Sequence, residues 1–117
     1  MEIKKFEVNK RQFTFVCETY ENSNAWGHEV NLFEDDTKFI SKARIRYYNR
    51  TWECYRYQTT MKKAVSYEIE YIKQQIENAY KNDNNVKRMT EKHRKALQDI
   101  YDNNKNLQDF IELYNIL

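Results

Sequence analysis

The sequence predicts an α+β protein in which an antiparallel sheet of four to five strands is followed by two to three helices. Up to about residue 58, aromatic and β-branched residues alternate with polar ones, as in half-buried strands. Beyond that point, apolar residues recur every three or four positions, which is the spacing of an amphipathic helix. The 117 residues suit a single domain, which we expect to be β-rich over 1–58 and helical over 59–117.

The β-rich half contains five candidate strands, each a short alternating run bounded by turn-forming residues. They span residues 3–8, 12–20, 28–33, 42–48 and 51–57. The last two would form a hairpin around Asn49 and Arg50, which places Arg46 opposite Glu53 as a cross-strand ion pair. In that register the core-facing residues are Ala43, Ile45, Tyr47, Trp52 and Cys54.

The helical half opens with a long amphipathic helix, expected over about residues 60–80 and packed on the sheet. Thr59 or Thr60 supplies a suitable N-cap. An Asn-rich run at 81–85 ends this helix, and a second apolar stripe follows over residues 86–100.

A further helix break is expected at residues 103–106, which are again rich in Asn. Asn106 and Asp109 resemble a capping box that would begin a short third helix. The alternative is one continuous helix, because neither Pro nor Gly enforces the break.

The composition excludes several classes of function. Twenty basic residues against eighteen acidic ones give a net charge of +2, which excludes an acidic DNA mimic and gives no support to a protein that coats DNA. The single Gly excludes Gly-rich nucleotide-binding loops. His28 and His93 have no metal-ligand spacing, and no nucleophile-elbow motif is present. We therefore expect no enzymatic activity, no cofactor and no metal.

The two cysteines indicate a reducing compartment. Cys17 and Cys54 form no CxxC motif and are too few for a disulfide scaffold, so we expect both to be reduced and buried. One bridge between them is the alternative if their strands pair. The charged start of the chain does not resemble a signal peptide, and no apolar run approaches the ~20 residues of a membrane span. We expect a cytoplasmic protein.

One face of the predicted 42–57 hairpin gathers basic and aromatic side chains. Such surfaces hold single-stranded nucleic acid, because rings stack on bases and cations meet phosphates. Tyr and Arg are also enriched at the hot spots of protein interfaces. A third interpretation is that the long helix covers this face and makes the tyrosines part of the core. The residues concerned are Lys42, Arg44, Arg46, Tyr48, Tyr55 and Tyr57.

Trp26 is a further candidate binding residue. It stands in a polar run, residues 21–27, beside the only Gly, and this run is expected to be a loop. Trp26 either packs into the core from that loop or, if exposed, anchors an interface.

The run from Tyr48 to Val65 resembles a segment of small proteins from phages and mobile elements of Gram-positive bacteria. The similarity lies in NRTWE at residues 49–53, the alternating aromatics Tyr55 and Tyr57, and the helix that follows. Abundant Asn and Lys with scarce Gly and Pro also indicate an AT-rich gene, which is typical of low-GC bacteria and their phages.

That class of small proteins includes anti-CRISPR inhibitors. The resemblance implies a non-enzymatic protein that acts in the cytoplasm of an infected bacterial host. It would block a host defence machine, most concretely a CRISPR effector nuclease or its guide complex, by steric occupation of a functional site. The alternative is a nucleic-acid-binding module that uses the Arg/Tyr face. Both a monomer and a homodimer remain open.

Overall fold

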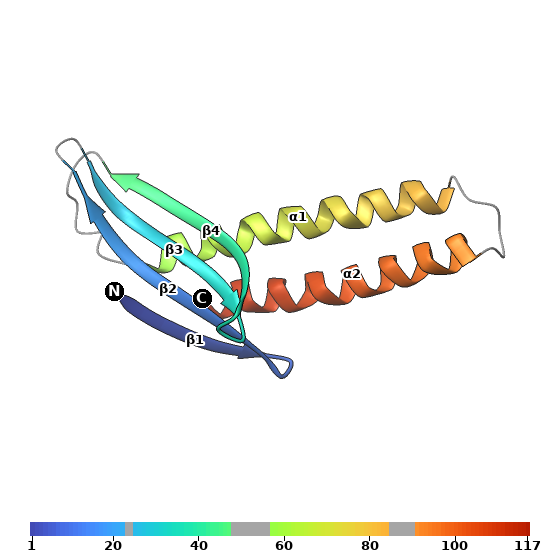
Figure 1. Cartoon of the computed structure of the whole chain (residues 1–117), viewed down its shortest axis with the longest axis horizontal. Coiled ribbons are helices and arrows are strands. Elements are labelled where there is room, and N and C mark those ends of the chain that lie inside the picture. Colours follow the sequence, from blue (N-terminus) through green and yellow to red (C-terminus); the bar gives the residue numbers. More distant parts are fainter. Residues whose placement is uncertain (23–24, 48–56, 85–90) are drawn as a thin grey trace.

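The computed structural model describes residues 1–22, 25–47, 57–84 and 91–117, and it confirms the predicted α+β class (Figure 1). The elements are β1 (Glu2–Val8), β2 (Arg11–Glu21), β3 (Trp26–Glu34), β4 (Lys38–Tyr47), α1 (Gln58–Asn84) and α2 (Glu91–Ile116). The strands form one antiparallel sheet in sequence order. The helices follow the sheet and pack on one of its faces.

Two tight turns connect the strands at the end of the sheet that lies nearest the middle of the helices. Asn9 and Lys10 join β1 to β2 with φ angles of 50° and 67°, the left-handed conformations of a type I′ hairpin. Asp35 and Asp36 join β3 to β4 with φ angles of 53° and 60°. Asn and Asp adopt such conformations more readily than most residues. The first turn carries Asn9 and Arg11 to the side of α2.

The core lies between the sheet and the helices. Alternate residues of β2 and β3 point toward the helices, as the period-2 pattern predicts, and they meet the apolar stripes of α1 and α2. Ser41 on β4 donates a hydrogen bond of 2.9 Å to the carbonyl of Ala64, which holds α1 against the sheet. The fully buried core residues include Phe13, Phe15, Leu32, Val65, Ile72, Phe110 and Leu113.

Beyond the sheet, α1 and α2 continue side by side as a two-helix arm (Figure 1). The arm accounts for the elongated dimensions of 59 × 30 × 23 Å. Its interior is narrow, because the facing stripes of two helices meet there, and the buried residues of its described part are Ala79, Ala96 and Ile100. Near its far end, His93 Nδ1 lies 2.6 Å from Asp83 Oδ1. No helix in the described ranges is long and apolar enough to cross a membrane.

The loop predicted at residues 21–27 is wrong at both ends. β2 runs to Glu21 and β3 begins at Trp26, and these two residues pair across the ladder. Asn22 and Ala25 continue the contact between the two strands: the Asn22 side chain accepts a hydrogen bond of 2.8 Å from the Ala25 amide, and the Asn22 amide donates one of 2.9 Å to the Ala25 carbonyl. Gly27 is required in β3, because a Cβ there would lie 2.0 Å from the carbonyl oxygen of Ile45.

The predicted break at residues 103–106 is also absent, and α2 is continuous through it. Asn104 donates to the carbonyl of Ile100 at 2.8 Å, a back-bond that a helix accommodates. Asn106 and Asp109 do not form a capping box. Both lie inside α2 and bind Arg11 from β2. The alternative of one continuous helix is therefore confirmed.

The predicted 42–57 hairpin lies largely outside the described residues, because its second strand and turn fall within 48–56. In the described part, β4 begins earlier than expected, at Lys38, and pairs with β3. Ala43 is buried, and Ile45 and Tyr47 are partly buried on the helix-facing side, as the expected register requires. Tyr57 lies in the turn that precedes α1.

Candidate functional site

The sequence-predicted binding residues do not all come together. Lys42, Arg44 and Arg46 lie exposed on the face of β4 that points away from the helices. Tyr48 and Tyr55 lie outside the described residues. Tyr57 and Trp26 belong to the opposite, helix-facing side of the sheet, as their contacts there show.

The cations of β4 are partly neutralised by an acidic residue of β3. Glu29 Oε1 lies 2.9 Å from Lys42 Nζ and 2.7 Å from Arg44 Nη2. These hydrogen bonds from Lys42 and Arg44 hold the pKa of Glu29 below its usual range. The Arg44 guanidinium also lies 4.8 Å from the centre of the Tyr20 ring. Two of the three basic residues therefore already face a carboxylate on this surface.

Trp26 is a core residue rather than an anchor. It is 8% exposed, and its ring centre lies 5.8 Å from that of His28 and 5.5 Å from that of Tyr47. The ring centre of Tyr57 lies 4.5 Å from that of His28, and the Tyr57 hydroxyl lies 2.8 Å from Thr19 Oγ1. Burial in this aromatic cluster lowers the pKa of His28.

A cleft of about 450 Å³ opens where the turn end of the sheet meets the two helices. Strands contribute one wall and helices the other, so the cleft depends on how the sheet and the helices are docked. The lining residues are Arg11, Glu34, Lys38, Phe39, Ile40, Glu68, Tyr71, Asn106 and Phe110.

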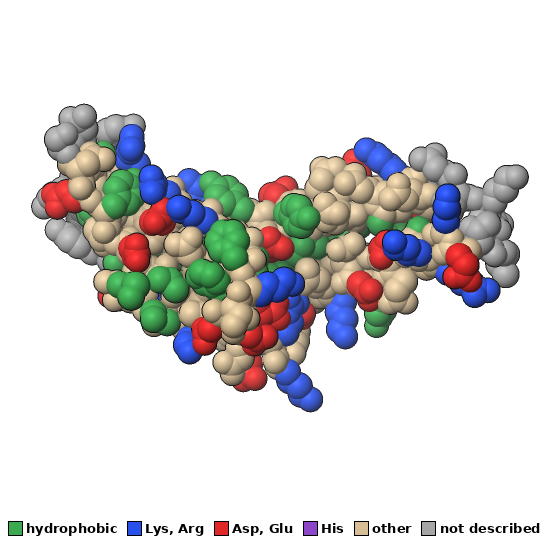
Figure 2. Space-filling view, in the orientation of Figure 1, with side chains coloured by type: hydrophobic (Ala, Val, Ile, Leu, Met, Phe, Trp, Pro, Cys, Tyr) green, Lys and Arg blue, Asp and Glu red, His purple; other side chains and the backbone are tan. Residues whose placement is uncertain are grey.

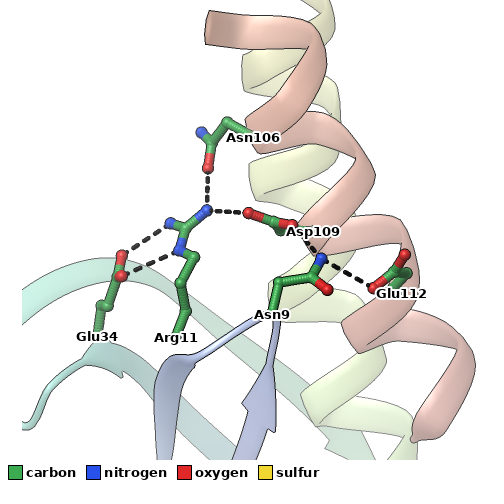
Figure 3. Close-up of polar contacts among 6 residues, drawn as sticks. All are labelled: Asn9, Arg11, Glu34, Asn106, Asp109 and Glu112. Carbon is green, nitrogen blue, oxygen red and sulfur yellow. Dashed lines mark hydrogen bonds and ion pairs between the residues drawn. The ribbon is translucent and has the colours of Figure 1, made fainter.

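Arg11, which lines this cleft, lies at the centre of a polar network that forms its floor, and Figure 3 shows the contacts of that network. Its Nε and Nη2 donate to both oxygens of Glu34, at 3.0 and 2.8 Å. Its Nη1 donates to Asp109 Oδ2 at 2.8 Å and to Asn106 Oδ1 at 2.6 Å. This bidentate, charge-assisted geometry joins β2 and β3 to α2. The Arg11 hydrogen bonds hold the pKa of Glu34 below its usual range.

The turn before β2 extends the same network. Asn9 Nδ2 donates to Asp109 Oδ1 at 2.6 Å and to Glu112 Oε2 at 3.1 Å (Figure 3). The Arg11 guanidinium also lies 5.2 Å from the centre of the Phe13 ring and 5.3 Å from that of Phe110. The floor is therefore held by several elements at once and is well preorganised.

The rim of the cleft is aromatic and exposed. Phe39 is 55% exposed and Tyr71 is 60% exposed, and both line the cleft. Tyr67, 48% exposed, lies one turn before Tyr71 on the same face of α1. Lys63 lies one turn further back, 5.8 Å from the Tyr67 ring centre, and donates to the carbonyl of Arg44. We call Phe39, Tyr67 and Tyr71 the aromatic surface.

Glu68 brings an acidic group into the same cleft. It is partly buried in the wall formed by α1, and it makes no hydrogen bond or ion pair with any other residue that the structure describes. Burial raises its pKa, while Lys38 and Arg11 oppose that rise from a distance. Among the described residues this carboxylate has no direct counter-ion, and it lies beside an aromatic rim.

A second cleft, of about 500 Å³, lies at the other end of the helix-facing side. Its lining includes Tyr57, which already contacts His28 and Thr19, and Gln58, whose side chain donates to the carbonyl of Leu117. The polar groups there are thus engaged within the fold, and the cleft at Arg11 and Glu68 is the stronger candidate.

The described residues contain no group of His, Cys, Asp and Glu side chains that would hold a metal ion. Cys17 is fully buried in the core, as predicted, and burial raises the pKa of its thiol to about 11. A thiol in this state is a poor nucleophile.

Sequence reasoning missed the residues of the cleft. The strand predicted at 12–20 leaves out Arg11, and no sequence motif marks Glu68. One signal was available: Tyr67 and Tyr71 are four residues apart and lie off the stripe of Val65 and Ile72, which predicts an exposed aromatic row. No family model, curated protein or solved structure matches this chain.

Proposed function

We propose that this protein is a non-enzymatic binding protein that engages another protein through the aromatic surface beside the cleft. The observation that carries this proposal is the exposure of Phe39 and Tyr71, both lining a preorganised cleft, and of Tyr67 one turn before Tyr71 on α1. Tyr and Phe are enriched in the cores of protein interfaces, where they supply large contact area with few rotatable bonds.

The rigidity of the cleft supports a role in binding. Arg11 fixes β2, β3 and α2 relative to one another, and Ser41 fixes α1 to β4. A surface that is already ordered loses little conformational entropy when a partner docks. On the face seen in Figure 2, hydrophobic side chains are more abundant over the sheet half than along the arm.

The resemblance of the Tyr48–Val65 segment extends this proposal to a biological role. The protein would come from a phage or mobile element and would act in the cytoplasm of the host. Its target would be a host defence machine, most concretely a CRISPR effector nuclease or its guide complex, blocked by steric occupation of a functional site.

Cleavage assays with purified CRISPR effector nucleases and their guides test this role directly. A stoichiometric amount of the protein should stop target cleavage by its cognate nuclease. The double variant Tyr67→Ala/Tyr71→Ala should lose inhibition by at least tenfold, because it removes aromatic anchors. The matched control is Tyr80→Ala/Tyr101→Ala, which removes two tyrosines of the arm that are 51% and 64% exposed. A panel of nucleases unaffected by excess protein would contradict the proposed target.

Nucleic-acid binding is the second candidate, and one observation favours it. Lys42, Arg44 and Arg46 lie exposed along one face of β4. The pairing of Lys42 and Arg44 with Glu29 weighs against it, since a phosphate would have to displace that carboxylate.

Salt separates the two candidates. Binding to single-stranded nucleic acid should weaken steeply with salt, in proportion to the phosphates neutralised, and Arg44→Ala should reduce that slope by about one unit or less. Binding to a protein through aromatic anchors should change much less. If only nucleic acid is captured from host lysate, and high salt removes it, the nucleic-acid role replaces the protein-binding role.

A further inference from the structure

We infer that the cleft binds a cationic side chain, Arg or Lys, presented by the partner protein. The observation is the placement of the Glu68 carboxylate, which has no direct counter-ion among the described residues, in a cleft whose rim carries the exposed rings of Phe39 and Tyr71. This inference rests on the proposed protein-binding function and specifies the chemistry that the partner contributes.

The charges around the cleft favour a cation. Four of the five N–H donors of Arg11 are already engaged, because Glu34 accepts two hydrogen bonds and Asp109 and Asn106 accept one each. Lys38, the other basic lining residue, lies opposite Glu34 in the ladder between β3 and β4. Two cations, Arg11 and Lys38, and two carboxylates, Glu34 and Glu68, line the cleft. Asp109, which lies outside this lining, adds a third carboxylate by pairing with Arg11, so among these described residues one negative charge is left over.

The aromatic rim favours the same occupant. Ring faces attract ammonium and guanidinium groups, and a guanidinium also stacks on them through its flat surface. Ile40 and Phe110 add apolar lining that suits the aliphatic stem of Arg or Lys. An incoming carboxylate would instead meet Glu68 and Glu34, with Arg11 already engaged.

The partly buried environment of Glu68 favours the binding of a cation. Its pKa is raised because burial removes water from the carboxylate. A cation docked at this position would replace the lost solvation and form a hydrogen-bonded pair sheltered from solvent.

Short capped peptides test the inference directly. Ac-Gly-Arg-Gly-amide is titrated into the isotope-labelled protein and followed by NMR, with the Gln and Glu versions of the same peptide as comparisons. The Arg peptide should shift the signals of cleft-lining residues saturably, and the Gln and Glu peptides should not. Absence of shifts at the cleft, or equal shifts with the Glu peptide, would overturn the inference.

A matched pair of variants locates the effect at Glu68. Glu68→Gln keeps the size of the side chain and should weaken binding of the Arg peptide at least fivefold. Glu70→Gln, on the same helix, alters an exposed carboxylate whose partner is Lys73 and should leave binding unchanged. Thermal unfolding of both variants verifies that each is folded. Unchanged binding in Glu68→Gln would contradict the inference.

The inhibition assay separates this inference from the proposed function. If Glu68→Gln and Tyr67→Ala/Tyr71→Ala both lose inhibition, the cation-binding cleft is supported. If only the tyrosine variant loses inhibition, the protein-binding function stands and the cation inference fails. If neither variant loses inhibition, the aromatic surface is not the binding site and both proposals fail.

Discussion

The same two helices have very different surroundings in the two halves of the molecule. Over the sheet, α1 and α2 bury large side chains such as Phe110 and Leu113 against Phe13 and Phe15. Along the described part of the arm they pack against each other, and the residues buried there are Ala79, Ala96 and Ile100. An amphipathic stripe thus indicates that one side of a helix is buried. How much that burial stabilises the fold depends on the surface against which the stripe packs.

The candidate site lies at the border between these halves. The cleft takes walls from the ends of the strands and from the middle of both helices. It is therefore attached to the half of the fold that buries the large side chains of the core. Local opening should be easiest in the arm, which has fewer buried apolar contacts.

Removing one large side chain from each half should show the largest difference. Phe110→Ala in the sheet half should lower the free energy of unfolding by about 3–5 kcal/mol, because it leaves a cavity in a close-packed core. Ile100→Ala in the arm should cost about 2 kcal/mol, at the low end for such a change, because a narrow interior can collapse. Urea unfolding measures both. Equal costs would mean that the arm is packed as well as the sheet half.

The ion pairs of the two halves should differ next. Arg11→Met leaves Glu34 and Asp109 without their cation in a largely buried site, and should cost about 2–3 kcal/mol. Arg94→Met removes an exposed pair with Glu91 in the arm and should cost no more than about 0.5 kcal/mol. Chemical unfolding at pH 7 gives both values. A small cost for Arg11→Met would show that the contacts of Arg11 with Glu34 and Asp109 contribute little to stability.

Acid should act through the same cluster. The pKa of Glu34 is lowered from 4.5 in the folded protein, chiefly by its hydrogen bonds with Arg11. The corresponding stability is fully present above about pH 4.5 and is lost as the pH falls through the folded pKa. In Arg11→Met this part of the acid dependence should be absent. Unfolding curves between pH 3 and pH 6 compare the two proteins, and parallel pH profiles would contradict the role of Arg11.

Close packing in the sheet half should extend to its backbone. Gly27→Ala places a Cβ against the carbonyl oxygen of Ile45 in the neighbouring strand, so the strands must separate. We expect a loss of about 1–3 kcal/mol in unfolding free energy. Asn82→Ala on the exposed surface of the arm is the control and should stay within about 0.5 kcal/mol of wild type. A neutral Gly27→Ala would show that the two strands can move apart freely.

Much of the fold follows from periodicity. Alternation along the strand predicted at 12–20 puts Phe13, Phe15 and Cys17 on one face, and the 3–4 spacing of the helix predicted at 60–80 puts Val65 and Ile72 on one side. All five are buried. These patterns succeed because each depends only on which side of a local element is buried.

The site depends instead on contacts between distant residues, which no local pattern encodes. Arg11 and Asp109 are 98 positions apart, and Asp109 with Asn106 looked like a local capping box because the same side chains serve both purposes. Alternation also could not place Trp26, since a polar run with Gly27 is typical of loops and only the pairing with β2 makes it a strand. The sequence therefore predicts the sheet and the helices better than it predicts the side-chain contacts that join them.

The smallest expected effect is a pH response confined to the sheet half. Burial lowers the pKa of His28 below its usual value of 6.5, while the charge of Glu2 opposes this. Below about pH 6.5 the unfolded chain therefore binds a proton that the folded protein resists, so stability is lost as the pH falls through the folded pKa. The slope should reach at most about 1.4 kcal/mol per pH unit.

His28→Phe tests this response, because it keeps a ring among Trp26, Tyr47 and Tyr57 but removes the titrating group. Thermal or urea unfolding between pH 5 and pH 7.5 should show a shallower pH dependence in the variant than in the wild type. Identical slopes would place the proton uptake elsewhere in the molecule. A shallower slope would show that the aromatic cluster, like the core beside it, excludes water from its interior. The close packing that distinguishes the sheet half from the arm would then extend to the far end of the sheet.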